Sequence, residues 1–164
     1  MKIILKGRRV IGGSAEGEAV VTAQPISFLG GVDPDKGTVV ERGHELEGQS
    51  ITGKVFVFPH GKGSTAGPYI IYAMAKRQTA PSAIINVEAE PIIAVGAAMG
   101  NIPLVDRLDQ NPLKVIAMGD YVKVDGDKGT VEIIKKGLKP FMLFPGLGSQ
   151  SASLGSIRQW FFHG

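Results

Sequence analysis

The sequence predicts a mixed α/β domain of β/β/α architecture, in which a partly parallel central sheet is combined with further strands. Apolar runs of strand length alternate with two helical patterns through the middle of the chain, whereas both ends carry strand patterns alone. The 23 glycines fall in clusters between these runs. Such clustering is typical of many tight turns and favours a sheet-rich domain over a helical bundle.

The N-terminal part of the chain is expected to form mainly β-structure. Residues 2–5 and 18–22 have strand patterns, with a glycine cluster between them. An apolar loop follows over residues 26–33, and Asp33-Pro34-Asp35-Lys36-Gly37 then indicates a turn. Residues 38–40 are expected to form a short strand after this turn.

Three largely apolar runs in the middle of the chain predict buried strands. These runs are residues 55–58, 83–87 and 102–105. Because residues 55–58 are apolar on both faces, this strand should lie in the interior of the sheet. Residues 66–77 are expected to form a helix, since their apolar residues recur at helical spacing, and residues 91–99 a second helix that ends at Gly100.

The end of the predicted domain is again β-structure. Residues 115–116 are expected to form a short strand. Residues 120–124 and 130–134 are expected to form a hairpin, in which Asp125-Gly126 supplies the positive φ that such turns need.

Length and composition are those of an ordinary single-domain protein. With 164 residues, of which 43% are hydrophobic and 20% charged, the chain can bury a core without disulfides or metals. The composition changes near Gly137, so we expect a domain over residues 1–136 and a C-terminal tail over residues 137–164. The tail is either a loosely ordered extension or a segment whose aromatic residues dock on a partner or a second copy.

Charge, hydropathy and cysteine content argue against several function classes. The net charge of +3 is modest and the basic residues are scattered, which argues against nucleic-acid binding. No apolar run reaches the ~18 residues of a membrane span, and the N-terminal apolar stretch is too short for a signal peptide, so we expect a cytoplasmic protein. Without cysteine the chain has no thiolate ligand for zinc or an iron–sulfur cluster, and any such cofactor must come from another chain. The three histidines show no ligand spacing.

The most informative segment is Gly61-Lys62-Gly63-Ser64-Thr65, which follows one predicted strand and precedes a predicted helix. Such a turn points backbone N–H groups and the positive end of the helix dipole into one small space. We therefore expect either an anion cradle or the seat of a reactive Ser64 hydroxyl, since the same donors stabilise an alkoxide. Lys62 either steers an anionic substrate or is a solvated loop lysine.

Other interpretations of this region stay open. The turn could be purely structural, or it could bind a dinucleotide with Glu88 in the place of the ribose-binding acid, although its glycine spacing is one residue too long for that motif. His60 and the pair Asp106-Arg107 follow predicted strands. They could line the same site, or be a surface histidine and a surface ion pair.

The Ser64 turn and five other segments together form a specific pattern. The other five are Gly12-Gly13-x-Ala15-Glu16-Gly17-Glu18-Ala19, Pro25-Ile26-Ser27-Phe28-Leu29-Gly30-Gly31-Val32-Asp33, Arg42-Gly43-His44, Gly53-Lys54-Val55 and Ala83-Ile84-Ile85-Asn86. This combination resembles the swivel domain of aconitase-type hydro-lyases, in its aconitase X branch, and the turn is similar to the Gly-x-Gly-Ser-Ser turn of that domain. The resemblance covers residues 2–134 and leaves the tail outside.

The resemblance implies a swivelling β/β/α domain, which in archaea is a separate small subunit. It implies that Ser64 is the catalytic base, that Gly61, Lys62, Gly63 and Thr65 bind substrate or support the turn, and that this chain binds no metal. The expected partner is a large subunit with an iron–sulfur cluster, whose iron acts as Lewis acid on the departing hydroxyl. The implied reaction removes water from (R)-5-phosphomevalonate to give trans-anhydromevalonate 5-phosphate in an archaeal mevalonate pathway, and the small subunit alone should be inactive.

Two departures and three rival functions accompany this resemblance. Ala66 stands where common aconitases have an arginine, so carboxylate binding by that arginine does not carry over, and His60 stands where a small residue is expected. The same base would serve a cis-3-hydroxyproline dehydratase of the family. Residues 119–126 also resemble a unit in swivelling phosphohistidine domains, but no histidine here has the loop context of those carriers. The last rival is an interaction module without chemistry.

Overall fold

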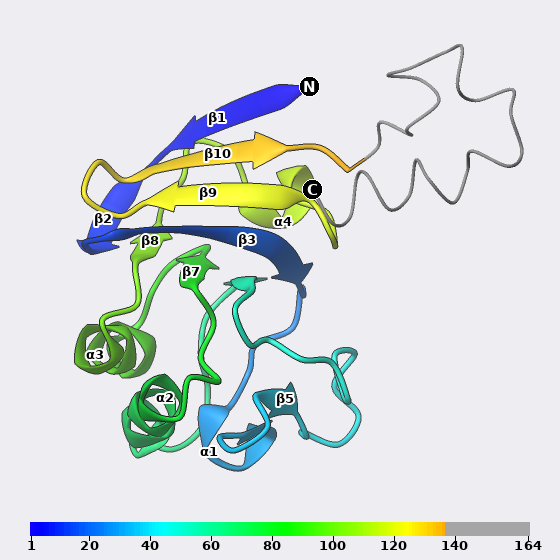
Figure 1. Ribbon diagram of the computed structural model, residues 1–164, viewed down its shortest axis with the longest axis vertical. Coiled ribbons are helices and arrows are strands. Elements are labelled where there is room, and N and C mark those ends of the chain that lie inside the picture. Colours follow the sequence, from blue (N-terminus) through cyan, green and yellow to red (C-terminus); the bar gives the residue numbers. More distant parts are fainter. Residues whose placement is uncertain (137–164) are drawn as a thin grey trace, which may run out of the picture.

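Three layers make up residues 1–136, the part of the chain that the computed structural model describes (Figure 1). A layer of antiparallel strands lies on one side, a mainly parallel layer in the middle, and helices on the other side. This arrangement confirms the predicted β/β/α architecture with its partly parallel sheet. The predicted tail over residues 137–164 lies outside the described residues, and its separate character stays a prediction.

The middle layer contains the strands that the apolar runs predicted. It consists of β3 (Ser14–Val21), β6 (Val55–Phe58), β7 (Ala83–Asn86) and β8 (Leu104–Asp106), each parallel to its neighbour in that order. All residues of β6, β7 and β8 are buried, which confirms the expectation that β6 lies inside the sheet. The edge strand β2 (Arg8–Ile11) runs antiparallel to β8.

The outer layer is built from β1 (Lys2–Lys6), β10 (Thr130–Ile134) and β9 (Tyr121–Asp125), all antiparallel to their neighbours. The first half of β3 pairs with β9 and its second half with β6, so β3 belongs to both layers. Gly7 alone separates β1 from β2, which stand at opposite ends of the eight-strand order. A Cβ at Gly7 would overlap the Asp106 carbonyl oxygen, so glycine is needed where the chain crosses between the layers.

Two helices cover the middle layer. They are α2 (Gly67–Lys76) and α3 (Pro91–Gly100), which pack side by side (Figure 1). Each has a proline in its first turn, where the missing N–H costs nothing. Glu90 caps α3 by accepting hydrogen bonds from the N–H groups of Ile92 and Ile93.

A small lobe lies beside α2. It contains α1 (Phe28–Gly31), β4 (Val32–Asp33) and β5 (Thr38–Val39), with the predicted turn between β4 and β5. Inside α1 the backbone of Leu29 and Gly30 is not helical, and Gly30 has φ of 84°. This segment is therefore close to a type II turn, which places Leu29 at an exposed tip.

The core has two halves, one on each face of the middle layer. Val55 and Val57 of β6 face the antiparallel strands, whereas Phe56 and Phe58 face the helices. Phe28 of α1 packs its ring against both of these phenylalanines, at centroid distances of 6.4 and 6.2 Å. Burying one such side chain contributes about 1.5–3 kcal/mol. The α1 lobe is thus fixed to the sheet beside the end of β6.

Two local expectations were wrong, and one strand was missed. Residues 115–116 form no strand, because Pro112 begins the short helix α4 (Pro112–Val115) and the Asn111 side chain caps it. In the β9–β10 hairpin the positive φ, 72°, belongs to Gly129 and not to Gly126, whose Cβ would instead overlap the Ile11 carbonyl oxygen. The strand that was missed is β2, in which two arginines interrupt any apolar pattern.

Three helix boundaries differ by one residue. Helix α2 begins at Gly67 and ends at Lys76, whereas the expected range was 66–77. Helix α3 continues through Gly100, and the left-handed residue that ends it is Asn101, with φ of 55°. None of the helices in the described part of the chain has the length and hydrophobicity to span a membrane.

Candidate active site

The predicted turn connects β6 to α2, at the carboxyl end of a parallel strand. This is the edge at which open α/β sheets bind their ligands. The turn rests on the segment that leads into α1, because Gly61 forms a parallel bridge with Ile26 and the Lys62 N–H donates to the Ile26 carbonyl at 3.0 Å. The α1 lobe is therefore one wall of the site.

Ser64 is exposed at this turn. Its Oγ accepts a hydrogen bond from the Ala66 N–H at 3.0 Å, and its carbonyl oxygen accepts one from the Gly67 N–H at 3.0 Å. The Tyr69 N–H donates to the Ala66 carbonyl, and Pro68 has no N–H. The first N–H groups of α2 thus have partners within the chain and are not free to bind an anion. What the turn offers is an exposed hydroxyl with one backbone donor on its oxygen.

The two glycines before Ser64 are required for different reasons. Gly61 is buried, and a Cβ there would lie 2.6 Å from Glu90 Oε1 and 2.7 Å from Ile93 Cγ1, at the start of α3. Gly63 has φ of 88°, and a Cβ there would overlap Ser27 Oγ. Both positions let the turn lie close to its neighbours, which supports the predicted structural role of these glycines.

Lys62 has a specific partner that the sequence did not indicate. Its Nζ lies 2.8 Å from Glu41 Oε2, and Glu41 Oε1 accepts the Ser27 N–H at 3.2 Å. Burial alone would raise the pKa of Glu41, but the hydrogen bonds from Lys62 and Ser27, with the nearby charge of Lys62, bring that pKa below its ordinary value. Glu41 is therefore ionised at neutral pH and pairs with the Lys62 ammonium.

Thr65 and His60 flank the turn without joining Ser64. Both are exposed. Nδ1 of His60 lies 2.7 Å from the Gly61 carbonyl oxygen, so this nitrogen carries a proton and donates to that oxygen. Within the described residues no hydrogen bond links His60 to Ser64, and His60 has a local contact typical of a surface histidine.

Asp106 and Arg107 do not pair with each other. Asp106 is buried and accepts two hydrogen bonds from Arg8, at 2.9 and 2.7 Å, and one from the Ala89 N–H. The hydrogen bond to Asp106 raises the pKa of Arg8. Arg107 has φ of 50° and donates to the exposed Glu88. These contacts of Asp106 and Arg107 hold the loop after β7 in place. Glu88 is the ion-pair partner of Arg107.

The described residues do not fit an iron–sulfur cluster. The chain has no cysteine, and the described residues contain no group of three His, Asp or Glu side chains placed to hold a metal ion. The site is a serine turn with a lysine–glutamate pair beside it.

The comparison with protein families decides the relationship of this chain. The family model described as "Aconitase X swivel domain" matches residues 4–133. The chain belongs to the aconitase X swivel-domain family. The resemblance of the Ser64 turn and its accompanying segments is thereby confirmed.

Relatives in this family are similar over almost their whole length. The "Phosphomevalonate dehydratase small subunit" of Methanocella arvoryzae is 55% identical over 129 residues, which cover 79% of this chain and 98% of the relative. Proteins with the same name from Methanosarcina acetivorans and Thermococcus kodakarensis are 56% and 53% identical, covering 84% and 81% of this chain and 96% and 98% of the relatives.

Two solved structures have the same fold. The crystal structure of the holo form of Thermococcus kodakaraensis aconitase X includes a chain that is 51% identical, with a TM-score of 0.77, over 81% of this chain and 99% of that one. A solution NMR structure of a UPF0107 protein is 47% identical, with a TM-score of 0.75, over 81% and 100%.

Proposed function

We propose that this chain is the small, swivel-domain subunit of a phosphomevalonate dehydratase, a hydro-lyase of an archaeal mevalonate pathway. The observation that carries the proposal is the identity of 53–56% to archaeal proteins of that name over nearly their entire length. The exposed Ser64 turn at the end of β6 supplies the chemical group that such a reaction requires.

The reaction converts (R)-5-phosphomevalonate to trans-anhydromevalonate 5-phosphate and water. The proton to be removed is on the carbon next to the carboxylate and is weakly acidic, so a positioned base is needed. We assign this role to Ser64 Oγ in its alkoxide form. The C–H electron pair becomes the second bond of the alkene, the hydroxyl on the neighbouring carbon leaves as hydroxide with its electron pair, and the proton passes to Ser64. That proton and the hydroxide together make the released water, which returns Ser64 to its alkoxide form.

Ser64 has local features that favour this role. The Ala66 N–H already points at Oγ from 3.0 Å, and such a bond strengthens when the oxygen carries a negative charge. Lys62 places a cation two residues away, in a position to attract the phosphate or carboxylate of the substrate. Gly61 and Gly63 shape the turn that carries these two side chains, and Thr65 follows Ser64 on the exposed surface.

A second chain is needed to complete the site. Ser64 is exposed, and a proton-transfer site has to be shielded from water. We propose that a large subunit covers this surface and carries the iron–sulfur cluster, since the present chain has no cysteine and residues 1–136 contain no group of three His, Asp or Glu side chains placed to hold a metal. The small subunit alone is then inactive, and closure of the two bodies completes the site. The expected cytoplasmic location stays a prediction.

Reconstitution tests this proposal. The chain is combined with the large subunit encoded by the same organism, and dehydration of (R)-5-phosphomevalonate and of cis-3-hydroxyproline is measured for the complex and for each subunit. Turnover of (R)-5-phosphomevalonate by the complex alone is expected. Turnover of cis-3-hydroxyproline instead would replace the substrate, and full activity of the large subunit by itself would reduce the present chain to an interaction module.

A further inference from the structure

Glu41 joins the Ser64 turn to the α1 lobe through both of its carboxylate oxygens. One oxygen lies 2.8 Å from Lys62 Nζ on the turn, and the other accepts the Ser27 N–H of the lobe at 3.2 Å. The Glu41 side chain is 22% exposed and that of Lys62 is 47% exposed. The carboxylate is thus more buried than the lysine it holds, and it is the fixed member of the pair.

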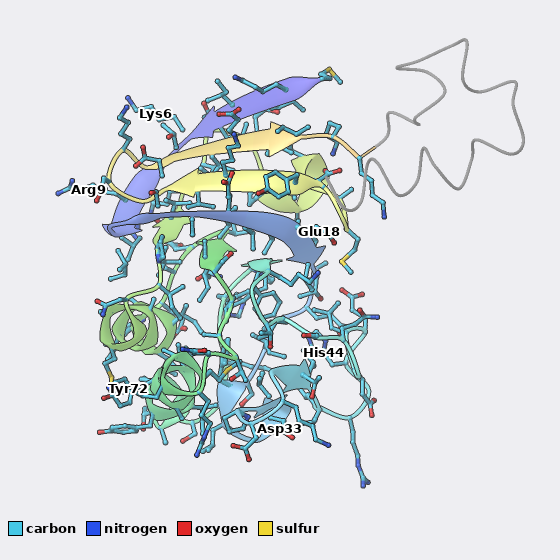
Figure 2. All side chains as sticks on the ribbon, viewed as in Figure 1. Lys6, Arg9, Glu18, Asp33, His44 and Tyr72 are labelled. Carbon is cyan, nitrogen blue, oxygen red and sulfur yellow. The ribbon has the colours of Figure 1, made fainter. Side chains whose placement is uncertain are left out.

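The loop that carries Glu41 is held against the lobe by backbone and histidine contacts. The N–H groups of Val40 and Glu41 both donate to the Gly31 carbonyl, at 2.8 and 3.1 Å. His44 is buried in this loop, on the side of the molecule where α1 and β5 lie (Figure 2). The Leu46 N–H donates to His44 Nδ1, so Nε2 carries the proton and donates to the Pro25 carbonyl at 3.1 Å.

Apart from its contact with Glu41, only the backbone of Lys62 is held in place. Its N–H donates to the Ile26 carbonyl, which fixes the start of the side chain, but four rotatable bonds separate that point from Nζ. A free lysine side chain loses much rotamer entropy when a ligand orders it. A lysine already held by a rigid carboxylate has lost most of that freedom beforehand, so an anionic ligand binds it at a lower cost.

We propose that Glu41 is a positioning residue, which holds the Lys62 ammonium beside Ser64 so that Lys62 meets the anionic group of the substrate in a preset place. This inference rests on the proposed function, because it assumes an anionic substrate at the Ser64 turn. Glu41 acts through Lys62 and touches no reacting atom. We place Lys62 on the phosphate of the substrate, which takes no part in the bond changes. Its loss therefore weakens the binding of substrate and transition state alike, and KM changes while kcat does not.

A double-mutant cycle in the reconstituted complex tests the proposal. Glu41→Gln keeps an acceptor for the Ser27 N–H but removes the charge that holds Lys62. We expect KM to rise about fivefold for Glu41→Gln and about tenfold for Lys62→Gln, with kcat within about twofold of the wild type. Because Glu41 acts through Lys62, the double variant should have the KM of Lys62→Gln alone.

The matched control is the Lys2–Glu132 pair on the antiparallel layer. Its atoms are 3.2 Å apart and Glu132 is 30% exposed, so the pair resembles Lys62–Glu41 in geometry and exposure. Glu132→Gln should leave both KM and kcat unchanged. Additive effects of Glu41→Gln and Lys62→Gln, a fall in kcat at constant KM, or an equal change in Glu132→Gln would each overturn the proposal.

A second measurement separates this inference from the proposed function. Nitrogen NMR of lysine ammonium groups is recorded on the full chain, where an ammonium held by a carboxylate exchanges its protons slowly. The Lys62 signal should be present in the wild type and lost in Glu41→Gln, and its presence in both would refute the positioning role. If the complex instead fails to dehydrate (R)-5-phosphomevalonate while this signal behaves as expected, the proposed function fails and the lysine–glutamate contact stands.

Discussion

Replacing Gly63 by alanine tests how the Ser64 turn is held against the α1 lobe. Gly63 has φ of 88°, and an alanine in this left-handed region costs about 1–2 kcal/mol of backbone strain. The added Cβ would also overlap Ser27 Oγ, while Ser27 Cβ lies 3.2 Å away. To clear the overlap the Ser27 hydroxyl has to give up its 3.0 Å hydrogen bond to the Leu29 carbonyl, which costs about 1 kcal/mol more. Gly63→Ala should therefore destabilise the fold by about 2–3 kcal/mol.

Gly53 provides the matched control for this substitution. Its φ is 68°, and nothing lies within 4 Å of the position of an added Cβ. Gly53→Ala should cost only the backbone strain, about 1–2 kcal/mol. Removing the hydroxyl with Ser27→Ala should then reduce the cost of Gly63→Ala to that of Gly53→Ala.

Urea unfolding of the full chain, followed by circular dichroism, measures these free energies. The comparison of the two glycines isolates the contact between Ser27 and the turn from the strain that both share. Equal costs for Gly63→Ala and Gly53→Ala would refute the reasoning. So would an excess cost at Gly63 that persists in the Ser27→Ala background, because the Ser27 hydroxyl would then not be its cause.

Two further predictions concern buried carboxylates and are read by the same unfolding assay. Asp120 is desolvated, which raises its pKa, but Lys135 and the N–H groups of Ala117 and Lys136 lower that pKa overall. The ionised Asp120 therefore stabilises the fold fully above the unfolded-state pKa of about 4, and this stabilisation is lost as the pH falls through the lower folded-state pKa. Asp120→Asn should lower the free energy of unfolding by about 3 kcal/mol at pH 7. The difference between the two proteins should become smaller below about pH 4. Asp106→Asn should lower the free energy of unfolding by about 2 kcal/mol, because Arg8 and the Ala89 N–H lose a charged acceptor. Glu88→Gln, in the exposed pair with Arg107, should lower it by less than about 0.5 kcal/mol. Equal losses in the two variants would contradict the conclusion that the buried Asp106 holds this loop.

The elements that the sequence predicted well are those in which burial is continuous. β6 and β7 are buried on both faces, and their short apolar runs, bounded by turn residues, indicate buried strands. β2 could not be predicted, because Arg8 pairs with Asp106 and the strand borders solvent, which removes the apolar pattern. The helix α4 has only four residues, and its cap Asn111 and following proline form a signal too short to outweigh the apolar Val115.

The same distinction holds at the candidate site. The turn around Ser64 could be predicted because its glycines, its preceding strand and its following helix are contiguous in sequence. The contacts of Glu41 with Lys62 and of Ser27 with Gly63 could not be predicted. They arise from the packing of the α1 lobe against the turn, and no local sequence pattern indicates them. The sequence suggested that Asp106 and Arg107 form one pair because they are adjacent. In the structure Asp106 pairs with Arg8 and Arg107 pairs with Glu88, since adjacent side chains at the end of a strand point in different directions.

The rate of the Ser64→Ala complex tests the central claim most directly. Ser64 Oγ is the proposed acceptor of the substrate proton, and its removal leaves the backbone of the turn in place. The reconstituted complex with Ser64→Ala should assemble normally in size-exclusion chromatography and should lose about 10³-fold or more in kcat. Ser14→Ala, an exposed serine at the start of β3, should retain wild-type kcat in the same preparation. An assembled Ser64→Ala complex that dehydrates (R)-5-phosphomevalonate within about tenfold of the wild-type rate would contradict the account.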